Sequence, residues 1–393
     1  MDEQTSTTVQ AAQGLVRWGQ REERMDRITR LAQRIFGVVW TSITVLDEHR
    51  AWFPSAQGFD IQVMPRHDSF CHTASQYDTT TLVADATLDE RFRELPAVVD
   101  RGIRFYAGVP LRDATGTTVA VLCLYDDRVR NLDDDDLLTL TDLAAWAEQE
   151  LLSSAEMVRA AQVQTSMLPS GPIRMAGWDI HGVCLPALAV GGDGFDYSVD
   201  EDVLHVGLGD VMGKGTGAAL LGAGIRAATR ATHAAVVAGV DLGVTVTQIA
   251  RTLSDDLERA DAFVTLFEGA VDLDDGYLRY VDAGMGLCLV VRADGAVERL
   301  LSDDLPIGVL ADSHWTEHST TIEPGDRMLV FSDGLLELLD DQQTWWQPVG
   351  EMVAAHEDAT ALLTTIARLT GTLRPPDDVT AVAVFRKPMA GQA

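Results

Sequence analysis

The sequence contains almost no lysine and no long apolar run. Lys214 and Lys387 are its two lysines, so arginine supplies nearly all of the 30 basic side chains, and 60 acidic ones outnumber them. The net charge of −30 repels nucleic acid and anionic lipid, so we expect neither nucleic acid nor a membrane as a partner. With no apolar run of about 20 residues and no basic-plus-apolar leader, we expect a cytoplasmic protein.

Cysteine is also scarce. The four cysteines, Cys71, Cys123, Cys184 and Cys288, show no Cys-x-x-Cys spacing. This argues against a zinc or thioredoxin-type site. We expect buried thiols in a reducing compartment.

The first half of the chain alternates helical and β-prone segments, and the 393 residues are enough for two or three domains. Residues 1–18 are polar and predict a disordered tail. Apolar spacing predicts a helix over 22–36, and the charge-rich segment 88–101 predicts another. The pattern predicts an α+β domain with a mostly antiparallel sheet over 19–152. The expected strands are 38–46, 81–83, 107–111 and 119–125.

A long helical pattern joins the two halves. The acidic run 133–136 suits the positive end of a helix dipole, and apolar spacing continues towards Pro169, which predicts a helical linker over 136–168. Two interpretations stay open. Such a helix can pair with a copy of itself and form a homodimer, or it can divide near Ser153-Ser154, with one part packed on each domain.

Residues 169–388 combine many short strands with a few long helices. The pattern predicts a β-sandwich flanked by helices. The expected helices are 218–237, 245–259 and 351–369, and the expected strands are 178–185, 196–200, 203–209, 263–272, 277–283, 287–292, 327–332 and 380–386.

Four aspartate positions in this half share one local context. Each follows or precedes a β-prone segment in a loop rich in glycine or proline: Asp193, Asp210, Asp333 and the pair Asp377-Asp378. Magnesium and manganese prefer oxygen ligands, and a two-metal hydrolase needs short carboxylates converging from several strand ends. Each aspartate alone also fits an ordinary turn, so the prediction of a two-metal site depends on all of them together.

Six segments of this half occur in an order that resembles a known family. They are 161–169 (AQVQTSMLP), 191–196 (GGDGFD), 209–215 (GDVMGKG), 263–267 (FVTLF), 332–337 (SDGLLE) and 377–380 (DDVT). The stretch resembles the PPM-type serine/threonine phosphatases, in the branch of the sporulation stage II protein E and the sigma-factor regulatory phosphatases. The resemblance implies an α-β-β-α sandwich.

The resemblance also implies a site and a reaction. Asp193 and Asp210 would bind two Mn²⁺ or Mg²⁺ ions, with Asp210 bridging them and the Val211 carbonyl adding an oxygen. Asp333 and Asp377 would complete the ligand set of the second ion, with Asp378 as a neighbouring or substitute ligand. These catalytic aspartates imply hydrolysis of phosphoserine or phosphothreonine by metal-activated water, without a phosphoenzyme. The implied substrate is a STAS-type anti-sigma-factor antagonist.

Two positions depart from the family pattern. Gly194-Phe195 replaces Phe-Tyr beside Asp193, and Met285 replaces a histidine. These changes motivate a second hypothesis, a weakened sensor or scaffold that binds the partner without turnover. Lys214 and Asp196 are candidates for positions next to the substrate, and Lys214 can equally be a surface lysine.

The segment 191–195 also differs at one position from the Gly-Gly-Asp-Glu-Phe signature of diguanylate cyclases. Gly194 stands where that signature has its glutamate. A cyclase needs this carboxylate, and the surrounding motifs are those of the phosphatases. We therefore do not expect cyclase activity.

The first half resembles a GAF sensor domain, with helices packed on its antiparallel sheet. The similarity lies in 68–72 (DSFCH), 83–86 (VADA), 89–93 (DERFR), 102–111 (GIRFYAGVPL) and 122–124 (LCL). The resemblance implies a domain that regulates the attached enzyme. Pockets of GAF domains bind cyclic nucleotides, haem, bilins or small metabolites, and some bind nothing. Cys71-His72 resembles a bilin-attachment pair, although a buried thiol beside a capping histidine fits better. We expect Trp40, Trp52, Phe53, Phe105 and Tyr106 to fill the core rather than line a pocket.

Overall fold

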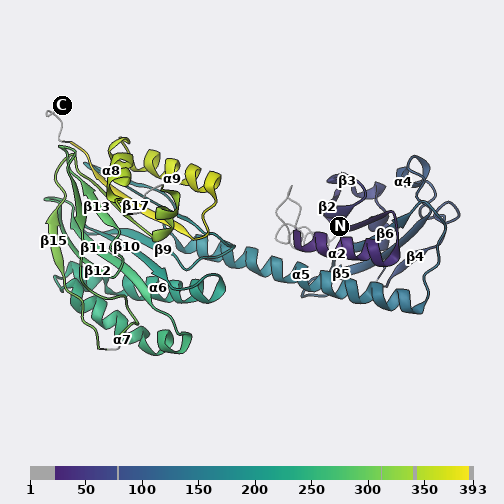
Figure 1. Cartoon of the computed structure of the whole chain (residues 1–393), viewed down its shortest axis with the longest axis horizontal. Helices are drawn as coiled ribbons and strands as arrows, with labels where there is room; N and C mark the ends of the chain where they lie inside the picture. The colour runs from purple at the N-terminus through teal and green to yellow at the C-terminus, as the bar shows by residue number, and fades with distance from the viewer. Residues whose placement is uncertain (1–22, 78, 311, 340–342, 389–393) are drawn as a thin grey trace. The chain divides into compact units, whose positions relative to one another are not determined.

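The structure, a computed structural model, describes residues 23–77, 79–310, 312–339 and 343–388 (Figure 1). The predicted tail at 1–18 lies outside these residues. The chain divides into two compact units, Met1–Arg159 and Ala160–Ala393, which are described separately. No helix in the described part of the chain is both long and apolar enough to cross a membrane.

The first unit contains a six-stranded sheet in which every neighbouring pair is antiparallel, as predicted. Helix α2 (Glu23–Phe36) buries Met25 and Ile28 on one face of the sheet, and short helices cover the other. The strands, in sheet order, are β3 (Val63–Pro65), β2 (Arg50–Gln57), β1 (Trp40–Leu46), β6 (Thr118–Asp126), β5 (Phe105–Arg112) and β4 (Thr81–Val83); the short helices are η1 (Arg66–Asp68), α3 (Phe70–Ala74) and α4 (Pro96–Val99).

The predicted helix over 88–101 is wrong. This segment consists of turns followed by the single-turn helix α4. The Asp89 carboxylate accepts a hydrogen bond from the Arg91 backbone N–H, a local contact that competes with helix formation. Pro96 then starts α4, because proline suits the first turn of a helix but not its interior.

Helix α5 (Asp134–Met167) is one continuous helix of 34 residues. It passes through Ser153-Ser154 without a break, so the predicted division there does not occur. Its first half belongs to the core of the first unit, and its last two turns belong to the second unit. The buried residues of α5 are Leu140, Leu143, Ala144, Ala147, Leu151 and Ala155.

The second unit is an α-β-β-α sandwich (Figure 1). One antiparallel sheet has the order β15 (His318–Thr321), β12 (Tyr277–Ala283), β11 (Val264–Asp272), β10 (Val203–Val211) and β9 (Gly194–Asp200). The other has the order β14 (Val297–Leu300), β13 (Cys288–Val291), β16 (Arg327–Phe331), β17 (Val379–Arg386), β8 (Trp178–Leu185) and β7 (Ile173–Met175).

Helices cover both outer faces of this sandwich. Helices α6 (Thr216–Val237) and α7 (Leu242–Ala260) pack on the first sheet. Helices α8 (Trp346–Ala354) and α9 (Ala359–Leu373) pack on the second. The single helix predicted over 351–369 is therefore two helices, because Asp358 caps a new helix by accepting a hydrogen bond from the Ala361 N–H.

Side chains of strand β10 point alternately into the core between the two sheets and towards helix α6. Leu204, Val206 and Leu208 lie in the core between the two sheets. The intervening residues point to the opposite face, against α6, because successive side chains of a strand alternate. Asp210 therefore shares the inter-sheet side, whereas His205 lies on the helix side.

Candidate metal centre

Loops from both sheets bring the candidate aspartates together. Asp193 immediately precedes β9, and Asp210 lies near the end of β10. Asp333 starts the 3-10 helix η2 (Asp333–Leu338) after β16, and Asp377 lies just before β17. These loops are at one end of the sandwich, so four carboxylates far apart in sequence interact electrostatically.

Two glycines allow the loops to approach closely. A Cβ on Gly192 would lie 2.6 Å from the Val211 carbonyl oxygen, and a Cβ on Gly334 would overlap the Asp378 carbonyl oxygen. Any other residue at either position would push the loops apart. The glycines next to Asp193 and Asp333 are therefore required by packing.

Burial, together with the charge of neighbouring carboxylates, raises the pKa values of Asp193, Asp210 and Asp333. Burial raises the pKa of Asp193 well above its usual range, and the charge of Asp210 adds to the shift. Burial also raises the pKa of Asp210 to about 6, with further contributions from Asp333 and Asp377. The pKa of Asp333 rises because of burial and the charge of Asp377. Such crowding of like charges is relieved when a cation binds.

These residues fit a hard divalent cation. Oδ2 of Asp193 is buried without a hydrogen-bond partner, which in a native site requires an explanation such as an ion. The available donors are carboxylate oxygens and the Val211 carbonyl, and magnesium and manganese prefer oxygen ligands. Asp193 and Asp210 thus offer the oxygen donors that such a cation prefers, and their role as ligands stays a prediction.

Asp378 has contacts that differ from those of the other aspartates. Its Oδ1 accepts a hydrogen bond of 2.7 Å from the Ala187 N–H, and its Oδ2 accepts one of 2.9 Å from the Gly192 N–H. The side chain is 4% exposed. Both oxygens therefore hold the loop that carries Asp193, which is a positioning role. The ligand role of Asp378 stays a prediction.

Lys214 and Asp196 have partners of opposite charge. The Lys214 ammonium lies 3.1 Å from Oδ2 of Asp377, so the lysine of the glycine-rich loop neutralises a candidate ligand. Asp196 is buried and pairs with Arg226 and Arg230 on α6. It faces the helix side of the sheet, opposite to the side that Asp210 shares.

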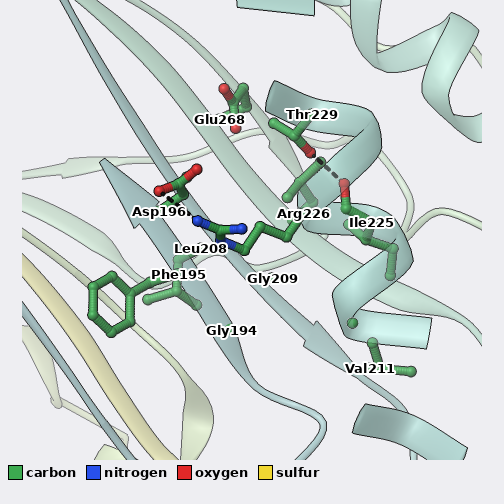
Figure 2. A pocket seen from close by; sticks show the side chains of 13 residues that line it. Gly194, Phe195, Asp196, Leu208, Gly209, Val211, Ile225, Arg226, Thr229 and Glu268 are labelled. Atoms are coloured by element: carbon green, nitrogen blue, oxygen red, sulfur yellow. Dashed lines mark hydrogen bonds and ion pairs between the residues drawn. The ribbon is translucent and has the colours of Figure 1, made fainter. Parts of the chain in front are cut away.

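The two departures from the family pattern have different structural results. Gly194 lines a cavity of about 30 Å³ between the sheet and α6, and a Cβ there would meet no atom within 4 Å. Figure 2 shows Arg226 reaching across this cavity to Asp196, while Phe195 points away. The Met285 side chain is buried in the inter-sheet core instead.

The sequence reasoning missed a role for Gln164 near the end of α5. Its side-chain amide donates a hydrogen bond of 2.7 Å to the Gly191 carbonyl, and its Oε1 accepts one of 3.2 Å from the Gly191 N–H. Gly191 is two residues before Asp193. The only signal in the sequence was its place inside the 161–169 segment.

The first unit has a pocket of about 400 Å³. Phe53 borders the pocket but is a buried core residue, as are Phe105 and Tyr106, whereas Trp40 lines the pocket and is only partly buried against the core. Cys71 is also fully buried, with its Sγ 3.1 Å from that of Cys123. The thiol is a core group, as the simpler interpretation of Cys71-His72 predicts.

Two family models match the chain. The GAF domain model matches residues 20–151, and the model described as Stage II sporulation protein E (SpoIIE) matches residues 200–387. The chain is a GAF domain fused to a SpoIIE-type domain. This confirms the predicted resemblance and, with the observed sandwich, the predicted fold class of the SpoIIE domain.

Two curated relatives match parts of the chain at 26% identity. Protein IcfG of Synechocystis sp. is 26% identical over 276 residues, which are 62% of this chain and 43% of the relative. The phosphoserine phosphatase RsbU of Bacillus subtilis is 26% identical over 194 residues, which are 48% of this chain and 55% of the relative. The chain thus spans about half the length of these curated relatives.

Similarity also extends to other proteins. A cyclic di-GMP phosphodiesterase of Pseudomonas aeruginosa is 42% identical over 110 residues, which are 28% of this chain and 19% of the relative. Among solved structures, the RsbU and RsbW domains of a Mycobacterium tuberculosis protein show 25% identity and a TM-score of 0.46, over 57% of this chain and 63% of that one.

Proposed function

We propose that the chain is a metal-dependent protein serine/threonine phosphatase that hydrolyses phosphoserine or phosphothreonine on a STAS-type anti-sigma-factor antagonist. The observation that carries the proposal is the convergence of Asp193, Asp210, Asp333 and Asp377 at one end of a SpoIIE-type sandwich. The name of its relative RsbU supports the reaction class.

The chain's own residues prepare the site for such a reaction. Asp193 and Asp210 would hold two Mn²⁺ or Mg²⁺ ions, and Asp333 and Asp377 would supply further ligands to the second ion. When bound, the ions supply charge neutralisation and an activated water. Asp378 fixes the Asp193 loop through its two backbone hydrogen bonds. The fixed carboxylates then need no rearrangement when a dianionic phosphate arrives.

The proposal is tested with the full chain, manganese, p-nitrophenyl phosphate and a phosphorylated STAS protein. Asp210→Asn removes the proposed bridging carboxylate, and we expect a loss of activity of at least about a hundredfold. Asp256→Asn is the control, because Asp256 is an exposed residue of α7. Full activity in Asp210→Asn would rule out this site.

The second candidate function is a scaffold that binds the partner without turnover. The cavity beside Gly194 and the ion pair between Lys214 and Asp377 favour it. The same assay separates the two functions. Binding of the STAS protein without hydrolysis under every metal condition would support the scaffold.

We propose that the GAF domain regulates the site through helix α5. One end of this helix is part of the GAF core, and Gln164 at the other end holds Gly191 with two hydrogen bonds. We propose that the GAF domain changes the position of α5 and so the order of the Asp193 loop. Exposed Leu138, Trp146 and Val163 on α5 are also consistent with a homodimer.

The route is tested with Gln164→Ala, and Gln162→Ala is its control because Gln162 lies on the same helix and is exposed. We expect Gln164→Ala to weaken manganese affinity about tenfold, as other changes outside the ligand shell do. Equal manganese affinity in the two variants would show that the contact between Gln164 and Gly191 does not influence the metal site. Native mass spectrometry of the full chain tests the homodimer.

A further inference from the structure

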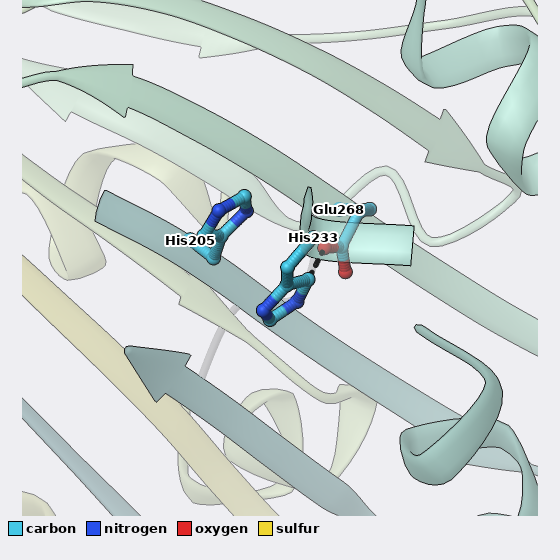
Figure 3. Close-up of side chains that lie close together, drawn as sticks. All are labelled: His205, His233 and Glu268. Carbon is cyan, nitrogen blue, oxygen red and sulfur yellow. Dashed lines mark ion pairs between the residues drawn. The ribbon is translucent and has the colours of Figure 1, made fainter. Parts of the chain in front are cut away.

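Three buried side chains from three elements of the SpoIIE domain meet on the helix side of the first sheet. His205 comes from β10, His233 from α6 and Glu268 from β11 (Figure 3). One ligand atom from each lies within 4.8 Å of the others. Within the described ranges, this is the one such group of His, Cys, Asp or Glu residues.

Hydrogen bonding leaves this cluster incomplete. Both ring nitrogens of His205 and Oε2 of Glu268 are buried without hydrogen-bond partners, and the three residues are at most 8% exposed. Buried polar atoms in native proteins are almost always paired, so such a group indicates a missing partner. An imidazole with neither nitrogen paired is an expensive arrangement for a protein core.

A hydrogen bond outside the cluster orients His233 towards Glu268. Nδ1 of His233 lies 3.3 Å from the Ser198 hydroxyl, which leaves Nε2 to face Glu268 Oε1 at 3.7 Å. Orientation of a ligating imidazole through its other nitrogen is typical of metal sites. The His205 and His233 rings are stacked with centroids 3.9 Å apart, so binding one ion through both imidazoles requires the two ring planes to tilt towards each other.

We propose that His205, His233 and Glu268 bind a divalent transition metal, with zinc as the best match. Two imidazoles and one carboxylate form a donor set that suits zinc, whereas magnesium prefers oxygen alone. Zinc ligand distances are about 2.0–2.2 Å, so the observed 3.7 Å between Nε2 and Oε1 already allows one ion to contact both atoms. Water or a fourth side chain completes the shell.

This site is separate from the aspartate centre. His205 and Asp210 lie on the same strand but on opposite faces of it, because five positions separate them. The cross-strand neighbours of Glu268 include Gly207, also on the helix face. The site would therefore join β10, β11 and α6 and stabilise the layer behind the catalytic loops, and the proposal does not depend on phosphatase activity.

The test uses the full chain, stripped with a chelator and titrated with zinc, with metal content measured by mass spectrometry. Asp210→Asn serves as the background, because it removes a carboxylate of the other centre. We expect this variant to retain about one zinc ion per chain and to give a cobalt spectrum with nitrogen ligation. Adding His233→Gln should weaken zinc binding by more than about tenfold.

Two further variants keep the result decisive. His205→Phe preserves a ring in the stack while removing both nitrogens, so it separates loss of metal from loss of packing. His314→Gln, at an exposed histidine, should leave zinc affinity unchanged. The proposal is overturned if the Asp210→Asn background retains no zinc, or if His205→Phe and His233→Gln retain it as fully as His314→Gln.

Discussion

The two roles considered for Asp378 predict opposite results for Asp378→Asn in the metal-free protein. As a ligand, Asp378 would be one more repelling carboxylate, and its neutralisation would relax the site. As a positioning residue, it holds the Ala187 and Gly192 N–H groups at 2.7 and 2.9 Å, and its neutralisation would release them.

The two hydrogen bonds of Asp378 determine the expected free-energy cost of Asp378→Asn. Asparagine keeps one acceptor oxygen but presents an NH₂ group to the second backbone N–H. One charge-assisted hydrogen bond is lost and one buried donor is left unpaired, at a cost of about 2 kcal/mol. Because about 1.4 kcal/mol corresponds to a tenfold change in an equilibrium, local opening should increase roughly 30-fold.

Hydrogen exchange of peptides covering 187–193 measures this local opening. We expect Asp378→Asn to accelerate exchange in this segment, whereas Asp377→Asn should change it little. Asp377 is the matched control because it is adjacent, is 40% exposed and forms an ion pair of the kind that contributes about 0–1 kcal/mol. Unchanged or slower exchange in Asp378→Asn, together with lost manganese binding, would refute the positioning role.

Further predictions concern the helix side of the sheet and the glycines. Burial raises the pKa of Glu268 from 4.5 to about 7, so in the metal-free protein its native form holds a proton that the unfolded form has lost, and stability falls as pH rises from about 5 to about 7. Glu268→Gln should remove up to about 3 kcal/mol of this dependence, as measured by thermal unfolding against pH; a parallel profile in both proteins would contradict it. Gly194→Ala should stabilise the protein by about 0.4–1 kcal/mol in urea unfolding, because its Cβ enters open space. Gly192→Ala should destabilise it, because its Cβ would lie 2.6 Å from the Val211 oxygen; equal effects at the two glycines would show that this contact is unimportant.

Local sequence patterns predicted most strands and helices correctly, because alternation and helical spacing are properties of short segments. The strands 178–185 and 277–283 match β8 and β12 at both ends. The predictions fail where a single side chain determines whether a turn or a helix begins. Asp89 forms a turn in place of a helix, and Asp358 starts a new helix inside a predicted one.

The sequence by itself determined the domain types and the four candidate aspartates, because glycine-rich motifs around carboxylates recur in a fixed order. Only the tertiary structure distinguished Asp378, whose oxygens hold the Gly192 loop, from Asp193, whose Oδ2 is unpaired. It also placed His205, His233 and Glu268 together. Such contacts depend on which strand faces pair and how a helix lies across them, and spacing along one chain does not contain that information.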